Sequence, residues 1–354
     1  QIKKKTLVIV HKEFLMNQWI ERIEQFLPNA RIGKIQGQIM DIDNKDIVLC
    51  MLQSLSMKDY PSTLFDSFGF TIIDEVHHIS SEVFSCALFK LVTKYTLGLS
   101  ATMDRKDGTT KVFKMFLGDI IHKEKTDTTE HKVIVKAIHY KVDDDEFNEI
   151  KYDYRGNPLY STMISKLCTY NHRSEFILKV LETELKQNPE QQIMILAHNK
   201  SLITYLHNAI EHRSIATVGY YIGGMKEADL KISEGKKVII ATYAMASEGL
   251  DIKTLTTLIM ASPKTDVCQS VGRILRTKHT SPLVIDIIDN NDIFEKQWHK
   301  RRQYYMKQKY NIISCDNHSY IKNQWQTTYD PDKSVESLKK IKKLYNKHAL
   351  CFSG

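Results

Sequence analysis

The sequence has 354 residues, of which 42% are hydrophobic and 26% are charged, and its net charge is +8 at neutral pH. This length and composition are typical of a globular protein with two lobes, and no apolar run approaches the roughly 20 residues that a membrane span requires. The sequence opens without a signal segment, and its six cysteines include no C-x-x-C pair. We therefore expect reduced thiols in a cytoplasmic protein that is neither secreted nor membrane-bound.

Apolar runs that look like strands alternate with helix-period segments over the first third of the chain. Continuous apolar strands separated by amphipathic helices are typical of a parallel sheet covered on both faces. Residues 1–125 are therefore predicted to form a first α/β lobe. Its expected strands are "TLVIV" (6–10), "DIVLC" (46–50), "FTIID" (70–74) and "YTLGLS" (95–100).

The same alternation returns later and predicts a second α/β lobe over residues 166–292. The polar stretch between the lobes, residues 126–165, contains the strand-like run "KVIVKAIHY" and is interpreted as a connector with the entry strand of the second lobe. The strands expected inside the second lobe are "QQIMILA", "KVIIAT", "LTTLIMA" and "PLVIDII".

After residue 292 the alternation stops, and residues 293–354 are predicted to form a basic helical tail. From Lys296 onward the sequence has 13 Lys and Arg against 4 Asp and Glu. Such an excess of positive charge favours a polyanionic partner such as nucleic acid. A solvated surface tail is the alternative for the same composition.

The segment "FTIIDEVHHIS" (70–80) places a pair of carboxylates directly after an expected strand. In parallel α/β sheets, ligands bind beyond the carboxyl ends of the strands. There Asp74 could hold Mg²⁺, and Glu75 could orient and polarise an attacking water. Acidic residues end strands in many folds, so a structural role is the alternative for this pair taken alone.

The segment "VCQSVGRILRT" (267–277) is predicted to be a helix with an amide and two guanidinium groups on one face. Gln269, Arg273 and Arg276 follow the spacing i, i+4 and i+7. Guanidinium groups suit phosphate because they offer several donors in one plane. A surface helix with two salt bridges is the alternative, but a metal-binding lobe combined with an arginine-bearing lobe is the arrangement of an ATPase cleft.

Two further segments follow expected strands and carry polar groups. "LGLSATMDRKDG" (97–108) supplies Ser100 and Thr102, which could hydrogen-bond His77 and couple the metal site to the rest of the lobe. In "IIATYAMASEGLDI" (239–252), Gly249 permits a close backbone approach, and Asp251 could accept a ribose hydroxyl or pair with an arginine.

Taken in order, these segments resemble motifs Ia to VI of superfamily 2 helicases, over nearly all of residues 5–285. The runs "DEVHH", "LSATMDRKDG" and "YNHR" are similar to the XPB-like branch, and within it to DNA helicases of large cytoplasmic DNA viruses such as poxviruses and asfarviruses. The ordered set consists of "TLVIVHKEFLMNQW", "IVLCMLQSLS", "IIDEVHH", "LGLSAT", "QIMILAHNK", "IIATYAMASEGLDI" and "QSVGRILR".

The resemblance implies two tandem RecA-like lobes with mostly parallel sheets that bind ATP and Mg²⁺. It assigns Asp74 to Mg²⁺, Glu75 to water activation, and the helix with Gln269, Arg273 and Arg276 to the γ-phosphate. It assigns Ser100 and Thr102 to the coupling motif. Motif positions near the backbone of the bound strand are occupied by Lys12, Gln53, Ser54, His198 and Thr242.

The family's first motif, G-x-x-x-x-G-K-[ST], does not occur in the sequence. "RIGKIQG" (31–37) and "SEGKKV" (233–238) contain Gly-Lys pairs but lack the rest of the pattern. We expect the motif on a strand and helix before residue 1, which would leave the first lobe incomplete. The chain as given is therefore expected to show no ATPase activity above background.

These features favour an ATP-dependent helicase or translocase. DNA is the expected substrate, with RNA as the other candidate, and the protein is expected to be a monomer. The resemblance alone implies viral transcription or transcript release, with the transcription machinery as partner and the host cytoplasm or virion as location. The alternative is a non-hydrolysing clamp that binds nucleic acid or a polymerase. An unrelated nuclease or glycosyl transferase would leave the arginine helix unexplained.

Overall fold

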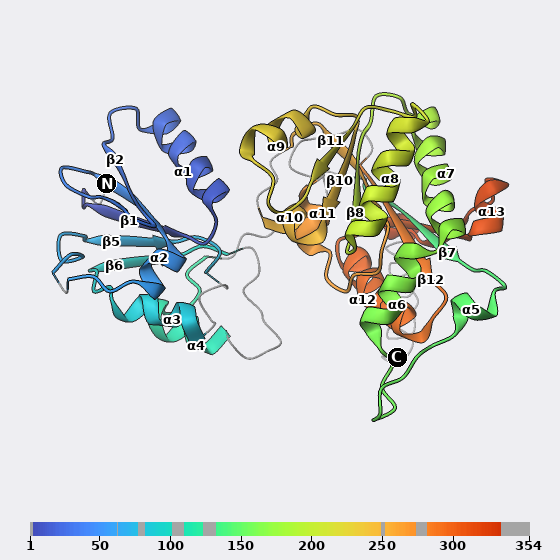
Figure 1. Cartoon of the computed structure of the whole chain (residues 1–354), viewed down its shortest axis with the longest axis horizontal. Coiled ribbons are helices and arrows are strands. Elements are labelled where there is room, and N and C mark those ends of the chain that lie inside the picture. Colours follow the sequence, from blue (N-terminus) through green and yellow to red (C-terminus); the bar gives the residue numbers. More distant parts are fainter. Residues whose placement is uncertain are drawn as a thin grey trace, which may run out of the picture. The chain divides into compact units, whose positions relative to one another are not determined.

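The chain divides into two compact units, residues 1–125 and 126–354, each built on one sheet with helices on both faces (Figure 1). This confirms the expected α/β class with mostly parallel sheets. No helix in the described part of the chain is long and apolar enough to cross a membrane. The computed structural model describes residues 3–61, 63–76, 82–100, 110–122, 132–248, 252–273 and 282–333.

The first unit has a six-stranded sheet in the order β3-β2-β4-β1-β5-β6, in which only the pairing of β2 with β3 is antiparallel. Helix α1 covers one face, and α2 and α3 cover the other. The elements are β1 (Thr6–Val10), α1 (Glu13–Phe26), β2 (Ile32–Gln36), β3 (Ile39–Asp41), β4 (Ile47–Met51), α2 (Leu52–Met57), β5 (Phe70–Ile73), α3 (Glu82–Phe89), β6 (Tyr95–Gly98) and α4 (Thr110–Leu117).

Strand β1 explains why an apolar run forms the centre of this sheet. Leu7 and Ile9 pack in the core on the side of α2 and α3, whereas Val8 and Val10 pack in the core under α1. Side chains alternate between the two faces of a strand, so a strand covered on both sides needs consecutive apolar residues. A charge at any of these four positions would be buried without a partner.

The second unit has an eight-stranded sheet in the order β14-β13-β7-β12-β11-β8-β10-β9, in which only β14 is antiparallel to its neighbour. The elements are β7 (Ile134–Tyr140), α5 (Asp145–Asn148), α6 (Tyr160–Thr169), α7 (Asn171–Gln187), β8 (Gln192–Ala197), α8 (Lys200–His212), β9 (Val218–Tyr221), α9 (Glu227–Glu234), β10 (Val238–Thr242), α10 (Tyr243–Glu248), β11 (Leu255–Met260), α11 (Cys268–Arg273), β12 (Leu283–Asp289), α12 (Asp292–Lys307), β13 (Asn311–Asp316), α13 (Asn317–Ile321) and β14 (Gln326–Tyr329).

The central strand β8 separates two apolar layers of this unit. Ile193 and Ile195 point into the core formed with α6, α7 and α8, whereas Met194 and Leu196 point into the core formed with α10, α11 and α12. All four side chains are at most 1% exposed. The sheet is therefore a rigid base for the loops that leave the carboxyl ends of its strands.

The segment after residue 292 is built into the second unit as far as it is described. Trp298 and Tyr305 of α12 are buried in the core, and β13 pairs in parallel with β7. The described part of the predicted basic helical tail is thus packed structure that contains strands, because its apolar residues face the sheet. The predicted limits at residues 165 and 292 stay predictions, and residues 334–354 lie outside the described part.

Candidate nucleotide and nucleic-acid sites

In the first unit, several predicted site residues come to one edge of the sheet. Strands β4, β1, β5 and β6 are consecutive neighbours and all parallel, so the residues that follow them lie side by side. These segments are 52–54 after β4, 11–12 after β1, 74–75 after β5 and 99–100 after β6.

Both carboxylate oxygens of Asp74 accept hydrogen bonds from its own unit. The indole Nε1–H of Trp19 donates to Oδ2 over 2.9 Å, and the backbone N–H of Glu75 donates to Oδ1 over 2.9 Å. The backbone N–H of Asp74 donates to the carbonyl of Ile9 over 3.0 Å. The carboxylate is thereby held in one orientation, with further lone pairs on both oxygens.

Asp74 fits the Mg²⁺ that the family implies. Mg²⁺ takes oxygen ligands and is usually bound through one or two carboxylates, with waters and substrate phosphates as its other ligands. No group of three or more His, Cys, Asp and Glu with metal-binding geometry occurs among the described residues, so an all-protein cage is not available there. One oriented carboxylate beside an open pocket suits a nucleotide-bound Mg²⁺.

Glu75 has a left-handed backbone conformation, with φ of +47°. For a residue other than glycine such a conformation costs of order 1–3 kcal/mol, and it often marks functional turns. The backbone N–H of Val76 then donates to the carbonyl of Leu99 over 2.9 Å, which fixes the turn against β6. The strain therefore falls on the residue predicted to orient the attacking water.

A pocket of about 520 Å³ opens beside these carboxylates. Asp74, Glu75 and Ser100 line it together with β6 and residues 117–122. Its volume lies within the range of small-molecule sites. β6 ends the sheet and pairs only with β5 in the described part of the unit, so the pocket lies beside a free strand edge.

The other predicted residues of this edge are tied into the first unit. The side-chain amide of Gln53 donates to the carbonyl of His11 over 2.7 Å, and the hydroxyl of Ser54 accepts from the backbone N–H of Gly37 over 3.0 Å. Lys12 is half-buried, and desolvation lowers the pKa of its amine. The structure thus places these residues at the carboxyl edge of the sheet, and their contact with a nucleic-acid strand stays a prediction.

The second unit brings His198 and Thr242 to neighbouring positions. His198 follows β8 and Thr242 ends β10, and these two strands pair in parallel with Thr242 opposite Ala197. On the other side of β8, strand β11 is followed by Ser262 and Lys264. Three adjacent strands therefore present polar side chains at one edge.

His198 is fixed by the loop that follows β11. Its backbone N–H donates to the hydroxyl of Ser262 over 3.0 Å, its Nε2 lies 2.8 Å from the carbonyl of Pro263, and its ring lies 4.7 Å from that of Tyr243. Desolvation and the charge of Lys264 lower the pKa of His198 against the opposing effect of the Pro263 carbonyl. The neutral tautomer with a proton on Nε2 satisfies this geometry, because a carbonyl can only accept.

Two buried ion pairs pin the same edge of the second sheet. Arg173 donates to both oxygens of Asp289 over 2.5 and 2.8 Å and to the carbonyl of Ala261 over 2.8 Å. Arg301 donates to both oxygens of Asp286 over 2.7 and 2.8 Å. Arg173 thereby connects α7 to the ends of β11 and β12.

Burial works against both charges of the Arg173 pair. It raises the pKa of Asp289, and on Arg173 it acts to lower the pKa, but attraction and hydrogen bonding from Asp289 outweigh it and raise the pKa of Arg173 overall. The pair is ionised, because its geometry is bidentate and a guanidinium group does not lose its proton in proteins.

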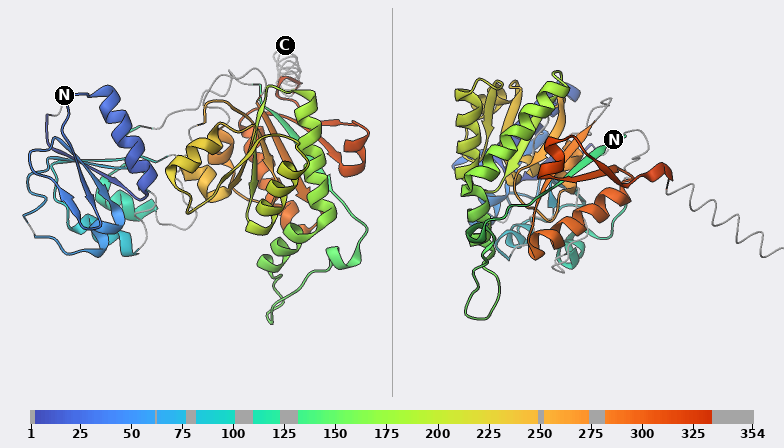
Figure 2. Two further views of the ribbon diagram at one scale, coloured as in Figure 1. Left: turned by 45° about the horizontal axis from the view of Figure 1, so that its top comes forward. Right: turned by 90° about the vertical axis from the view of Figure 1, so that its right-hand side faces the viewer.

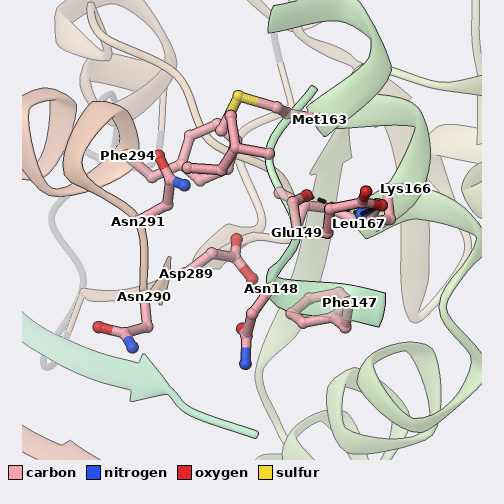
Figure 3. A pocket seen from close by; sticks show the side chains of 11 residues that line it. Phe147, Asn148, Glu149, Met163, Lys166, Leu167, Asp289, Asn290, Asn291 and Phe294 are labelled. Carbon is pink, nitrogen blue, oxygen red and sulfur yellow. Dashed lines mark hydrogen bonds and ion pairs between the residues drawn. The ribbon is translucent and has the colours of Figure 1, made fainter. Parts of the chain in front are cut away.

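A smaller pocket at the end of β12 is not a nucleotide site. Figure 3 shows the side chains of Asp289 and Asn291 on one side of it and those of Glu149 and Lys166 on the other. Its volume is about 30 Å³, the space of a single water. It is a packing gap where the loop after α5, helix α6 and the start of α12 meet.

The helix predicted for this segment is confirmed over α11, Cys268–Arg273, and Val271 on it is fully buried. The backbones of Gln269 and Arg273 lie on this helix, whereas their side chains lie outside the described part of the structure. Five other predicted site residues also lie outside the described residues, namely His77, Thr102, Gly249, Asp251 and Arg276.

Sequence reasoning missed Trp19 and Lys264. Trp19 is packed against the apolar core under α1, and the signal for its role is that a buried indole N–H usually finds an acceptor. The Lys264 ammonium lies 5.7 Å from the centre of the Tyr243 ring, at the edge that also carries His198. The only signal for Lys264 was a lysine shortly after an expected strand.

Comparisons with known proteins identify the family. A family model described as "Type III restriction enzyme, res subunit" matches residues 1–105. A putative ATP-dependent RNA helicase of Acanthamoeba polyphaga mimivirus is 38% identical, over 96% of this chain and 66% of that protein. A putative ATP-dependent RNA helicase of African swine fever virus is 26% identical, over 88% of this chain and 65% of that protein. A probable helicase of Escherichia phage T5 is 26% identical, over 95% and 70%.

Solved structures support the fold. S. cerevisiae Dbp5 bound to RNA and ADP BeF3 has a TM-score of 0.58 at 11% identity, over 91% of this chain and 80% of that chain. The Pyrococcus furiosus Hef helicase domain has a TM-score of 0.52 at 13% identity, over 85% of this chain and 89% of that chain. The two units are thus RecA-like lobes in tandem. The chain spans about two thirds of the length of its mimivirus and African swine fever virus relatives. It belongs to the superfamily 2 helicases.

Proposed function

We propose that this chain is the motor core of an ATP-dependent nucleic-acid helicase or translocase. The observation that carries the proposal is the arrangement after β5. There the oriented carboxylate of Asp74 and the strained Glu75 border a pocket of about 520 Å³ beside the free edge of β6. A nucleotide with its Mg²⁺ needs these elements: an oxygen ligand, a group that orients water, and space.

In this proposal each lobe contributes separate groups to the reaction. Asp74 holds Mg²⁺, which when bound neutralises charge on the phosphates, and Glu75 orients the attacking water. Gln269, Arg273 and Arg276 contact the γ-phosphate, where arginines supplied to the transition state are worth about 10³–10⁵ in rate. ATP binding and hydrolysis then close and reopen the lobes on the strand.

The strand-binding groups in this proposal lie at the same carboxyl edges. Lys12, Gln53 and Ser54 serve the first lobe, and His198 and Thr242 serve the second, to which we add Lys264 because it lies beside Tyr243 and His198. DNA is the proposed substrate, with RNA as the alternative that the names of the mimivirus and asfarvirus relatives favour. Transcription in a host cytoplasm, with the transcription machinery as partner, is the setting that we propose from the resemblance of the sequence alone.

ATP hydrolysis also needs a phosphate-binding loop, and the sequence contains no G-x-x-x-x-G-K-[ST]. The free edge of β6 offers a place where a strand carrying such a loop could pair, directly beside Asp74 and Glu75. The proposal therefore includes that residues 1–354 alone bind nucleic acid but do not turn over ATP.

The test measures ATP hydrolysis with and without single-stranded DNA or RNA, for residues 1–354 and for the complete gene product. We expect hydrolysis that nucleic acid stimulates only in the complete product, and we expect Glu75→Gln to abolish it. Asp46→Asn is the control, because Asp46 lies in the same unit, is not part of the pocket lining, and pairs with Arg31 on the surface. It should leave hydrolysis close to that of the unmodified protein.

Two outcomes would contradict the proposal in different ways. Turnover by residues 1–354 that Glu75→Gln removes would mean that the phosphate cradle lies within the chain. If neither form hydrolyses ATP while both bind nucleic acid, the chain is the non-hydrolysing clamp that the sequence left as the alternative.

A further inference from the structure

Helix α12 has one buried face and one strongly basic face. The buried face is formed by Phe294, Trp298, Arg301 and Tyr305. The residues at the opposite positions of the helix are all exposed, namely Lys296, His299, Lys300, Gln303 and Lys307. Figure 2 shows α12, in orange in the right-hand view, on the outside of the second unit.

The lysines of this exposed face are not used for internal ion pairs. None of the ion pairs in the described part of the chain involves Lys296, Lys300 or Lys307. The acidic residues of α12 are confined to its first turn, where Glu295 lies 3.3 Å from His139. The three ammonium groups therefore remain available to an external anion.

The two arginines of α12 have other roles. Arg301 is buried against Asp286, and Arg302 donates to the carbonyl of Thr328 over 3.4 Å. The positive charge that α12 presents to the solvent therefore comes mainly from its three exposed lysines. The helix is also anchored at its start, where the side chain of Asn291 accepts from the backbone N–H of Ile293 over 3.0 Å.

Two other surface helices of this unit, α8 and α9, have mixed charge. On α9, Lys231 lies 3.7 Å from Glu227, and on α8 the exposed residues include both Lys200 and Glu211. The exposed face of α12, by contrast, carries three lysines and no acidic residue. Along the helix axis, Lys296 and Lys307 are about 16 Å apart, a length that corresponds to about five base pairs of duplex.

We propose that the exposed face of α12 binds the phosphate backbone of double-stranded nucleic acid. Recognition of bases in single strands uses exposed aromatic rings as stacking platforms. On α12 the tryptophan is buried and neither tyrosine is fully exposed, so its lysines suit phosphates rather than bases. The inference rests on the proposed function, and it adds a contact with the duplex that is separate from the carboxyl edges of the sheets.

The test compares binding of a fluorescein-labelled DNA duplex of mixed sequence across a series of salt concentrations. Lys296→Gln, Lys300→Gln and Lys307→Gln are combined in one variant, since Gln has nearly the helix propensity of Lys. Loss of three phosphate contacts should weaken binding and make the slope of log K against log salt shallower by about 2.7. A second variant with Lys→Arg at the three positions should keep the slope of the unmodified chain.

The matched control removes three exposed lysines elsewhere in the same unit, Lys179, Lys186 and Lys226, each changed to Gln. It has the same net charge as the α12 variant and should keep the slope within the error of the measurement. If the α12 variant and this control bind alike, the inference is wrong while the proposed function stands. If the unmodified chain shows no salt-dependent binding of DNA or RNA, the proposed function fails as well.

Discussion

The indole N–H of Trp19 donates a hydrogen bond of 2.9 Å to Oδ2 of Asp74, although the two residues are 55 positions apart in the sequence. Trp19 belongs to α1 and Asp74 follows β5, so the bond connects the helix layer to the carboxyl edge of the sheet. It leaves Oδ1 with the Glu75 backbone N–H. We infer that Trp19 is a positioning residue for the carboxylate that would hold Mg²⁺.

Trp19→Phe tests this role because it keeps an aromatic ring but removes the donor. A lost hydrogen bond to a charged group is worth about 1.5 kcal/mol, which corresponds to about a 10-fold change in an equilibrium constant. We expect the Mg²⁺ concentration for half-maximal ATP hydrolysis by the complete gene product to rise by about this factor. The rate at saturating Mg²⁺ should change much less.

Trp325→Phe is the control for this substitution. Trp325 also donates through its indole N–H, to Asn323 over 3.1 Å, but it lies in the other unit and its bond is exposed. It should leave the Mg²⁺ requirement unchanged. An unchanged Mg²⁺ requirement in Trp19→Phe would show that the bond serves only the packing of α1.

The buried pair of Arg173 and Asp289 should be essential for the stability of the second unit. Asp289→Asn leaves a fully buried guanidinium without its counter-charge, which typically costs about 3–5 kcal/mol of unfolding free energy. Urea denaturation measures this loss. Glu175→Gln on the same helix is the control, because the pair of Glu175 with Arg213 is 43% exposed on both sides and such pairs contribute at most about 1 kcal/mol.

An equal effect of the two substitutions would contradict this view. It would mean that the interior around Asp289 admits enough water to solvate Arg173, or that the buried pair relaxes to other partners. The Ala261 carbonyl, which already accepts from Arg173 over 2.8 Å, is the nearest such partner.

The strands and the positions of their carboxyl ends followed from the sequence, because burial on both faces of a strand demands an apolar run. "TLVIV" and "FTIID" therefore revealed β1 and β5, and the position of Asp74 at a strand end followed from chain direction. The bond from Trp19 to Asp74 could not be predicted in this way, since it depends on how far α1 is rotated over the sheet. Propensity and periodicity do not contain this information.

For the segment after residue 292, the sequence did not predict how the chain packs. Its basic composition indicated a tail, but a few apolar residues among many charges, such as Trp298 and Ile312, are enough to pack it onto the sheet. The parallel pairing of β13 with β7 joins residues about 180 positions apart, for which local sequence gives no signal.

Stability should depend on pH through His198. Desolvation lowers the pKa of His198 in the folded chain below its ordinary value of 6.5, and Lys264 adds to this effect. Between the lowered pKa of His198 in the folded chain and its ordinary pKa in the unfolded chain, the unfolded chain binds more protons than the folded chain. The unfolding free energy therefore rises with pH in this range. The contribution of His198 is thus present above this range and is lost as pH falls through it.

His198→Gln removes the titrating group and provides the measurement. Unfolding free energies of the two proteins are compared by urea denaturation between about pH 5 and pH 7.5, the range in which histidine titrates. The advantage of the unmodified chain over His198→Gln should be larger at the alkaline end. An advantage that is independent of pH, or larger at the acidic end, would contradict the lowered pKa.

Truncation distinguishes a free tail from the packed structure seen here. Removal of residues 296–354 takes away Trp298, Tyr305 and the whole of β13, each of which is part of the second unit's core or sheet. Fully burying one such aromatic side chain contributes about 1.5–3 kcal/mol, and marginal stability cannot absorb several such losses. We expect this truncated chain to unfold or aggregate, as monitored by circular dichroism and size-exclusion chromatography.

Removal of residues 334–354 alone is the matched control, because every core contact described for the second unit lies before residue 334. This shorter deletion should keep a cooperative unfolding transition. It also keeps all three lysines of the α12 face, so the salt dependence of DNA binding that depends on them should persist. A soluble, cooperatively folded protein after removal of residues 296–354 would show that α12 and β13 are dispensable, and the packing described for them would then not be what stabilises this lobe.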